Sequence, residues 1–261
     1  MKWTKEDIEN VCRMEKEGYS QRQIAKETNK PLGSVKTILR NRKEKVNRVL
    51  VIPDLHAPFV KEGALQFCID MYKKHKCNKV VFIGDILDNH YSSFHDTDPD
   101  GMGAGEELEK ALAVIREFGK HFPVANVCTG NHDCIGARRA FNAGLSKAWI
   151  RSVGEIIGIK GWQFSEEWVI DKVLYTHGTG RKAKQRCVQE FTSVVQGHYH
   201  SETYYETFVS AEKLMFAMQL GCLIDRKSYA MAYGKNFRKP QINVGIVVDN
   251  GRWGFIEHMP M

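Results

Sequence analysis

The chain has 261 residues, of which 43% are hydrophobic and 26% are charged, as in an ordinary globular protein with a substantial core. It has no apolar run near the roughly 18–20 residues that span a bilayer and no apolar signal core at its amino terminus, so we expect a cytoplasmic protein without a membrane partner. Its seven cysteines form no CxxC pair, which argues against a disulfide framework and favours small buried thiols.

The positive charge is concentrated at the amino terminus. Residues 1–48 contain thirteen Lys and Arg against seven Asp and Glu, so this segment carries +6 of the total formal charge of +7. Such asymmetry is typical of a segment that faces nucleic acid. A solvated basic tail is the alternative.

Three short helices are predicted in this basic segment. Residues 5–17 carry an apolar helical stripe that ends at Gly18, and Ser20 is a suitable N-cap for a second helix. Residues 29–33 interrupt that helix, and Ser34 is predicted to cap a third one.

The second and third helices resemble a helix-turn-helix DNA-binding motif, with residues 19–28 as its first helix and residues 33–42 as its recognition helix. We therefore predict a small all-α domain over residues 1–46 and a charged linker over residues 42–47. The side chains predicted to face DNA are Ser34, Lys36, Thr37 and Arg40. A helical bundle that binds protein or packs on the rest of the chain is the alternative.

From residue 48 the pattern changes to alternating strands and helices. Buried strands are predicted at 49–52, 79–83 and 125–128, with helices at 61–75 and 105–119. Repeated strand-then-helix units indicate a largely parallel sheet that binds ligands at the carboxyl ends of its strands.

After about residue 165 the pattern favours strands. The predicted strands are 168–173, 193–196, 203–210, 214–219, 241–249 and 254–258. The sequence Asp249-Asn250-Gly251 predicts a hairpin turn between the last two.

Five polar motifs follow apolar runs of this α/β region. In chain order they are Asp54-Leu55-His56, Gly84-Asp85-Ile86-Leu87-Asp88, Gly130-Asn131-His132-Asp133, His177-Gly178 and Gly197-His198-Tyr199-His200. Each is weak alone, because a lone histidine is more often structural than a ligand. Together they supply the carboxylate and imidazole donors of a site for two divalent cations, roughly 3.5–4 Å apart, that clamp a phosphoryl group. The absence of thiolate motifs argues against a structural zinc cage.

On these motifs, residues 48–261 resemble the calcineurin-like metallophosphoesterases. The resemblance implies a four-layer αββα sandwich, an α/β fold that we place at residues 47–261. It implies two divalent metal ions, for which we expect manganese, with iron, zinc, nickel or cobalt as alternatives. The first metal would be bound by Asp54, His56 and His200, the second by Asn131, His177 and His198, with Asp85 bridging them.

The same resemblance implies catalytic roles for three further residues. His132 stands where the family keeps the residue that contacts phosphate and protonates the leaving group. Asp133 would orient His132, with Asp88 as a further candidate for that task.

A narrower resemblance joins the chain to a phosphoesterase branch common in bacteriophage and prophage genomes. This resemblance rests on three segments: Asp54-Leu55-His56-Ala57-Pro58-Phe59, Gly84-Asp85-Ile86-Leu87-Asp88 and Gly221-Cys222-Leu223. If the gene belongs to a phage, the compartment is the cytoplasm of the host cell.

Basic residues beside two of the motifs bear on the substrate. Arg138 and Arg139 follow the third motif, and Arg181 and Lys182 follow the fourth, where they could bind the phosphates of a nucleic acid. Solvated loops are the alternative. We therefore expect a phosphodiesterase or nuclease that acts on DNA through metal-activated hydroxide, with His132 assisting the leaving group.

Two other functions stay open at this point. One is a phosphatase or a phosphodiesterase for a small molecule such as a cyclic nucleotide. The other is a DNA-binding regulator whose enzyme domain is vestigial. The sequence does not separate endonuclease from exonuclease action, and it leaves the native metal and the oligomeric state open.

Overall fold

A computed structural model gives the structure of the chain. It describes residues 3–41, 46–94, 97–225, 227–228 and 239–260. The chain divides into two compact units, residues 1–46 and residues 47–261, and each is described by itself. Within the described residues, no helix is both long enough and apolar enough to cross a membrane.

The first unit consists of three helices around a small apolar core. The helices are α1 (Lys5–Lys16), α2 (Gln21–Glu27) and α3 (Leu32–Asn41), and the core side chains are Val11, Cys12, Met14, Ile24, Val35 and Leu39. Ser20 caps α2 as predicted, because its hydroxyl accepts a hydrogen bond from the backbone N–H of Gln23. Residues 42–45 of the predicted linker lie outside the described residues.

The predicted N-cap of the third helix is wrong. α3 begins at Leu32, so Ser34 lies inside the helix and not at its N-cap. The reason is Pro31, whose carbonyl already accepts the helical hydrogen bond from the N–H of Val35 at 3.0 Å. Proline suits the start of a helix because its φ is fixed near the helical value.

In the second unit, a mixed sheet of six strands has the order β11-β10-β1-β2-β3-β4. Its strands are β1 (Val49–Ile52), β2 (Lys79–Phe82), β3 (Ala125–Cys128), β4 (Trp162–Ser165), β10 (Asn243–Val248) and β11 (Trp253–His258). β1 to β4 run parallel, whereas β10 and β11 are antiparallel to their neighbours. The predicted hairpin turn joins β10 to β11, and Asp249, Asn250 and Gly251 all have positive φ there.

A second sheet of five strands has the order β5-β6-β7-β9-β8. Its strands are β5 (Glu167–Ile170), β6 (Val173–Thr176), β7 (Ser193–Gln196), β8 (Tyr204–Val209) and β9 (Leu214–Gln219). The three inner strands β6, β7 and β9 are parallel, and the edge strands β5 and β8 are antiparallel to them.

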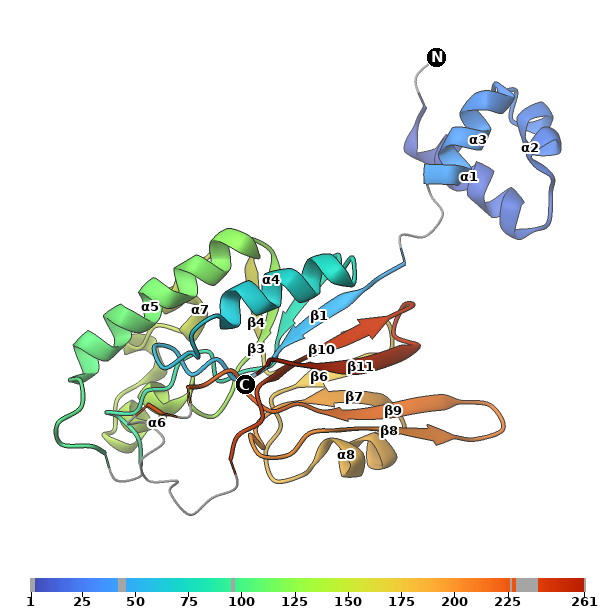
Figure 1. The fold of residues 1–261 in the computed structure, drawn as a ribbon. Helices are drawn as coiled ribbons and strands as arrows, with labels where there is room; N and C mark the ends of the chain where they lie inside the picture. Colours follow the sequence, from blue (N-terminus) through green and yellow to red (C-terminus); the bar gives the residue numbers. More distant parts are fainter. Residues whose placement is uncertain (1–2, 42–45, 95–96, 226, 229–238, 261) are drawn as a thin grey trace. The chain divides into compact units, whose positions relative to one another are not determined.

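The two sheets pack face to face, with helices on their outer faces (Figure 1). Alternate residues of β1 show why: Val49 and Val51 enter the core between the sheets, whereas Leu50 and Ile52 pack under the helices of the first sheet. The helices of the first sheet are α4 (Ala64–Lys74), α5 (Ala104–His121) and α7 (Val153–Ile157), and α8 (Ala183–Glu190) covers the second sheet. The predicted four-layer α/β fold is confirmed.

Two local predictions are wrong in this unit. Residues 168–173 are not one strand, because β5 and β6 form a hairpin whose turn residues Asp171 and Lys172 have φ of 53° and 63°. Lysine is not a residue that signals such a turn. The preference for strands predicted after residue 165 also misses the helix α8. The elements between residues 129 and 165 were not predicted: they are α6 (Ile135–Asn142), a short 3-10 helix (Lys147–Trp149), α7 and β4.

Candidate metal centre

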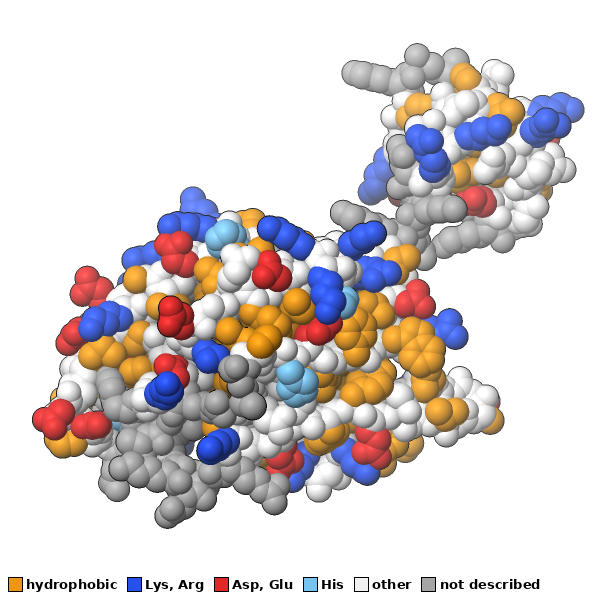
Figure 2. Space-filling model, in the orientation of Figure 1, with side chains coloured by type: hydrophobic (Ala, Val, Ile, Leu, Met, Phe, Trp, Pro, Cys, Tyr) orange, Lys and Arg blue, Asp and Glu red, His pale blue; other side chains and the backbone are white. Residues whose placement is uncertain are grey.

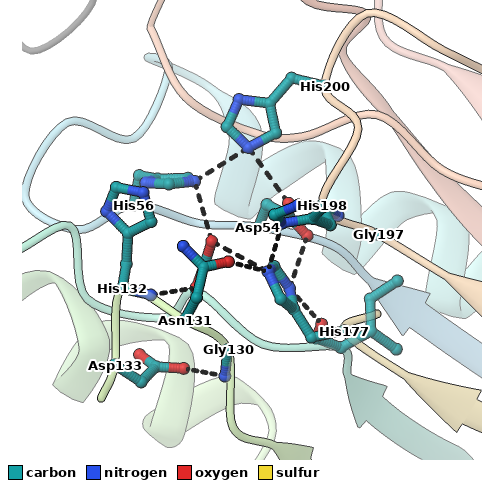
Figure 3. A network of polar contacts seen from close by, with 12 residues as sticks. Asp54, His56, Gly130, Asn131, His132, Asp133, His177, Gly197, His198 and His200 are labelled. Atoms are coloured by element: carbon teal, nitrogen blue, oxygen red, sulfur yellow. Dashed lines mark hydrogen bonds and ion pairs between the residues drawn. The ribbon is translucent and has the colours of Figure 1, made fainter. Parts of the chain in front are cut away.

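Five loops at the carboxyl ends of strands supply the side chains predicted to bind metal. Asp54 follows β1, Asp85 follows β2 and Asn131 follows β3 in the first sheet, whereas His177 follows β6 and His198 follows β7 in the second. Because the two sheets pack face to face, these loops meet at one end of the sandwich (Figure 3). The structure brings all seven predicted ligands together.

The first group of donors contains Asp54, His56, Asp85 and His200, whose donor atoms lie within 4.8 Å of one another. Nε2 of His200 is 3.0 Å from Nε2 of His56 and 3.1 Å from Oδ2 of Asp54. Asp54, His56 and Asp85 are buried, whereas His200 is partly exposed. This group therefore faces solvent at His200.

The second group centres on Nε2 of His177. That nitrogen lies 2.9 Å from Oδ1 of Asn131, 3.1 Å from Nδ1 of His198 and 3.1 Å from Oδ2 of Asp85. Asp85 thus belongs to both groups. A carboxylate shared in this way is what a bridging ligand between two close cations requires.

In two of the histidines, Nδ1 is hydrogen-bonded on the side away from the site, so the unprotonated Nε2 faces into the site. Nδ1 of His56 donates to Oδ1 of Asp88 at 2.6 Å, and Nδ1 of His177 donates to the carbonyl oxygen of Ile83 at 3.1 Å. In the neutral ring the other nitrogen, Nε2, then carries a lone pair. Two lone pairs directed at carboxylate and amide oxygens repel unless a cation lies between them.

Two further observations fit a cation at this place. Oδ1 of Asp54 is buried and has no hydrogen-bond partner among the described residues, which is costly for a carboxylate oxygen. Burial opposes protonation of His177, yet the carboxylates of Asp85 and Asp54 outweigh it and raise the pKa of His177 to about 10. The residues therefore fit divalent metal.

The glycines of the motifs let the loops approach the ligands closely. A Cβ at Gly130 would overlap Oδ1 of Asp85, and a Cβ at Gly197 would overlap Oδ1 of Asp54. Any other residue at either position would displace a carboxylate.

Three of the seven predicted ligands have left-handed backbone conformations. The φ angles of His56, Asp85 and His198 are 50°, 45° and 73°. Such conformations are strained for residues with a Cβ and gather at functional sites, where the surrounding structure holds them. Here the hydrogen bond from the N–H of His198 to Oδ2 of Asp54, at 2.8 Å, is one of the contacts that does so.

His132 lies beside this centre with its ring held from behind. Nδ1 of His132 lies 2.6 Å from the backbone carbonyl oxygen of Asp88. The backbone N–H of His132 donates to Oδ1 of Asp85 at 2.8 Å. Its ring centroid is 4.7 Å from that of His56. Nδ1 is therefore the donor to the carbonyl, and Nε2 is the nitrogen left for a substrate.

Asp133 was expected to orient the His132 ring, but its carboxylate instead accepts hydrogen bonds from two backbone N–H groups. Its Oδ1 accepts a hydrogen bond from the N–H of Leu87 at 2.9 Å, and its Oδ2 accepts one from the N–H of Gly130 at 2.8 Å. The buried Asp133 thus ties the loop after β2 to the loop after β3. The orienting contact of the His132 ring comes from the backbone of Asp88.

Two residues that hold the loop after Asp88 were not predicted from the sequence. Nδ2 of Asn89 donates to the carbonyl of His132 at 2.8 Å. Glu107 on α5 is buried and accepts hydrogen bonds from the N–H groups of His90 and Tyr91 at 2.7 and 2.9 Å. A signal for Glu107 was present, because it occupies the helix face otherwise lined by the buried Ala111, Ile115 and Phe118.

The predicted substrate-binding residues are partly engaged with the protein. The guanidinium of Arg139 donates to the carbonyls of Ser92 and Ser93. Lys182 forms an ion pair with Glu202 at 2.7 Å. The side chains of Arg138 and Arg181 are exposed.

The predicted DNA-facing residues all lie on α3 in the first unit. Lys36, Thr37 and Arg40 are exposed, whereas Ser34 is partly buried. The hydroxyl of Thr37 donates to the carbonyl of Gly33 at 2.9 Å, so its donor is already used within the helix.

Comparison with known proteins identifies the family. The model of the calcineurin-like phosphoesterases matches residues 47–220, which include all seven predicted ligands. The chain belongs to this family. The calcineurin-like phosphoesterases are hydrolases that use divalent metals. The Asp and His groups described above are therefore this chain's candidate metal-binding groups. This family match does not test the narrower resemblance to the phosphoesterase branch of bacteriophages.

Solved structures similar to this calcineurin-like phosphoesterase share little sequence with it. Vacuolar Protein Sorting 29 from Cryptosporidium parvum is 13% identical, with a TM-score of 0.42, over 83% of this chain and 99% of that one. A metallophosphoesterase from Sphaerobacter thermophilus is 12% identical, with a TM-score of 0.42, over 83% and 89%. The nuclease MPE of Pseudomonas putida is 14% identical, with a TM-score of 0.42, over 79% and 87%. No curated protein matches the chain.

Proposed function

We propose that this calcineurin-like phosphoesterase is a manganese-dependent phosphodiesterase that cleaves DNA. The observation that carries the phosphoester chemistry is the convergence of seven donors on two adjacent points, with Asp85 common to both groups. Carboxylate, amide and imidazole donors without thiolate suit manganese, and iron, zinc, nickel and cobalt compete for the same donors.

Different residues would bind the metal ions and protonate the leaving group. When bound, two divalent ions would supply Lewis-acid polarisation of the phosphoryl oxygens and lower the pKa of water. Asp54, His56 and His200 would hold one ion, Asn131, His177 and His198 the other, and Asp85 both. Because Nδ1 of His132 is bound to the carbonyl of Asp88, Nε2 is the ring nitrogen left for the leaving group. From there it would donate a proton to the departing oxygen.

The first unit supports DNA as the substrate. Residues 21–41 contain five Lys and Arg and one Glu. Within the part of the chain that the structure describes, Arg22, Lys26, Lys36 and Arg40 are exposed and form no ion pair, whereas Lys30 pairs with Asp7. Lys and Arg outnumber Asp and Glu on the face of this unit seen in Figure 2. Unpaired cations on short helices bind backbone phosphates.

The proposal is tested with end-labelled single- and double-stranded DNA and manganese-loaded protein, using Asn131→Ala as the inactive control. We expect cleavage by the wild type alone, and the product ladder separates endonuclease from exonuclease action. Intact DNA together with hydrolysis of bis(p-nitrophenyl) phosphate would refute the DNA substrate and leave a small-molecule phosphodiesterase. Hydrolysis of p-nitrophenyl phosphate alone would indicate a phosphatase.

A double variant, Lys36→Ala with Arg40→Ala, tests the role of the first unit. We expect a higher KM for long duplex DNA, a shallower dependence of binding on salt and an unchanged rate on bis(p-nitrophenyl) phosphate. An unchanged KM for duplex DNA would exclude α3 from substrate binding.

A further inference from the structure

The segment that follows the third motif combines positive charge with exposed apolar side chains. Residues 135–152 contain four Lys and Arg and no Asp or Glu. Phe141, Leu145 and Trp149 in this segment are 70%, 53% and 84% exposed. Large apolar side chains left in water so close together in sequence point to a binding surface.

A second segment adds two exposed aromatic rings and is bound to the first. Tyr91 and Phe94 are 56% and 44% exposed. The guanidinium carbons of Arg138 and Arg139 lie 4.8 and 4.3 Å from the ring centroid of Phe94. The Arg139 guanidinium also donates to two carbonyls of this loop. We call Tyr91, Phe94, Phe141 and Trp149 the aromatic platform.

The aromatic platform begins beside the candidate metal centre. The two segments that carry it start at Asn89 and His132, and these residues are joined by the hydrogen bond from Nδ2 of Asn89 to the carbonyl of His132. Arg138 and Phe141 are three residues apart on α6, so they are neighbours on one face of that helix. Aromatic and cationic side chains therefore alternate along two segments that begin at Asn89 and His132 and meet where Arg138 and Arg139 lie over Phe94.

We propose that the aromatic platform stacks the unpaired bases of a single-stranded nucleic acid whose phosphates are held by the neighbouring cations. Every base has a π face, so exposed rings interleaved with arginine bind single strands without reading their sequence. The inference deepens the proposed function, since the strand on the platform would be the one delivered to the site.

The test measures binding of a fluorescently labelled twelve-nucleotide oligothymidylate to the full chain in the presence of a chelator. The background is the Lys36→Ala, Arg40→Ala variant, which removes the contribution of α3. We expect Trp149→Ala and Phe141→Ala each to weaken binding on the order of tenfold. The affinity for a duplex of the same length is expected to change by less than about twofold, because its bases are already stacked.

A matched control removes an exposed tryptophan elsewhere. Trp253 is 44% exposed and pairs with Val248, at the end of the first sheet opposite to Asp54. Trp253→Ala is expected to bind the oligothymidylate as the background does. Trp149→Phe keeps a ring and is expected to retain most of the affinity, and both Trp149 variants are expected to hydrolyse bis(p-nitrophenyl) phosphate at the background rate.

Three results separate the ideas. Unchanged oligothymidylate affinity in Trp149→Ala would overturn the inference. Loss of co-sedimentation with phosphatidylglycerol–phosphatidylcholine vesicles in that variant, with oligothymidylate binding intact, would assign the platform to membranes and also overturn it. If Trp149→Ala weakens oligothymidylate binding but the wild type cleaves no DNA, the platform stands and the proposed nuclease function fails.

Discussion

Nδ1 of His132 lies 2.6 Å from the backbone carbonyl oxygen of Asp88. The carboxylate of the same Asp88 lies 2.6 Å from Nδ1 of His56. One residue therefore orients a predicted metal ligand through its side chain and a predicted general acid through its backbone. A side-chain substitution at Asp88 can separate the two roles.

Asp88→Asn is expected to weaken manganese binding about 10–100-fold, because His56 loses the charged acceptor that fixes its tautomer and raises its basicity. The hydrogen bond to His132 is made by the backbone and is expected to survive. Manganese titration of the hydrolysis of bis(p-nitrophenyl) phosphate measures the effect. Asp70→Asn, an exposed substitution on α4, is the control. Equal manganese affinity in Asp88→Asn and wild type would contradict the role of the carboxylate.

His132→Ala is expected to lower kcat on DNA by about 10²–10⁴-fold, the usual contribution of a general acid. The loss is expected to be much smaller on bis(p-nitrophenyl) phosphate, since nitrophenolate departs without protonation. Metal content is expected to match the wild type because His132 is not one of the seven predicted ligands. Rate assays on both substrates check this, and equal losses on the two would argue against leaving-group protonation.

Glu107→Gln is expected to lower the free energy of unfolding by about 1–3 kcal/mol, because one of two buried N–H groups loses its acceptor. The wild-type carboxylate accepts from His90 and Tyr91 and is 3% exposed. Urea denaturation measures the change. The neighbouring Glu106 is exposed and pairs with Lys110, so Glu106→Gln is a matched control expected to stay within about 0.5 kcal/mol of wild type. Similar values for the two variants would show that Glu107 does not support the loop.

The stability of the first unit is expected to fall in acid through Asp7. Hydrogen bonds from Lys30 and from the N–H of Thr4 lower the pKa of Asp7 below its ordinary value. A folded-state pKa below the unfolded one gives stabilisation that is present above about pH 4 and is lost as the pH falls through the folded value. Asp7→Asn is therefore expected to destabilise this unit at pH 7 and to approach wild type in acid.

Hydrogen exchange of residues 5–30, read by mass spectrometry at pH 7 and at about pH 3, checks the expectation for Asp7. Glu6→Gln serves as an exposed control on the same helix turn. A difference between Asp7→Asn and wild type that persists undiminished in acid would show that the ion pair with Lys30 is not its cause.

The sequence predicted the fold class because strand and helix patterns are local, whereas the set of seven donors was predicted from the resemblance of the five motifs to the calcineurin-like phosphoesterases. Apolar runs such as 49–52 fix where a strand ends, and the polar residue that follows, such as Asp54, must then lie at the carboxyl edge of the sheet. Parallel strands bring successive edges together. Placing Asp54 beside Asp85 also requires that β1 and β2 be neighbours in the sheet, as the structure shows.

What the sequence did not predict depends on contacts between distant residues. Lys182 and Glu202 are twenty residues apart, and only the packing of α8 on the second sheet shows that the charge of Lys182 is paired. The support of the loop after Asp88 by Glu107 likewise requires the position of α5. The turn between β5 and β6 was not predicted for another reason: Lys172 has a positive φ there, which is uncommon for lysine.

The central claim is that seven side chains form a site for two divalent ions. Its most direct test is the manganese content of the purified full chain, measured by inductively coupled plasma mass spectrometry after reconstitution and gel filtration. We expect two ions per wild-type chain and no more than one in Asn131→Ala, which removes a ligand of the second ion alone. One ion or fewer in the wild type, or two in the variant, would contradict the claim.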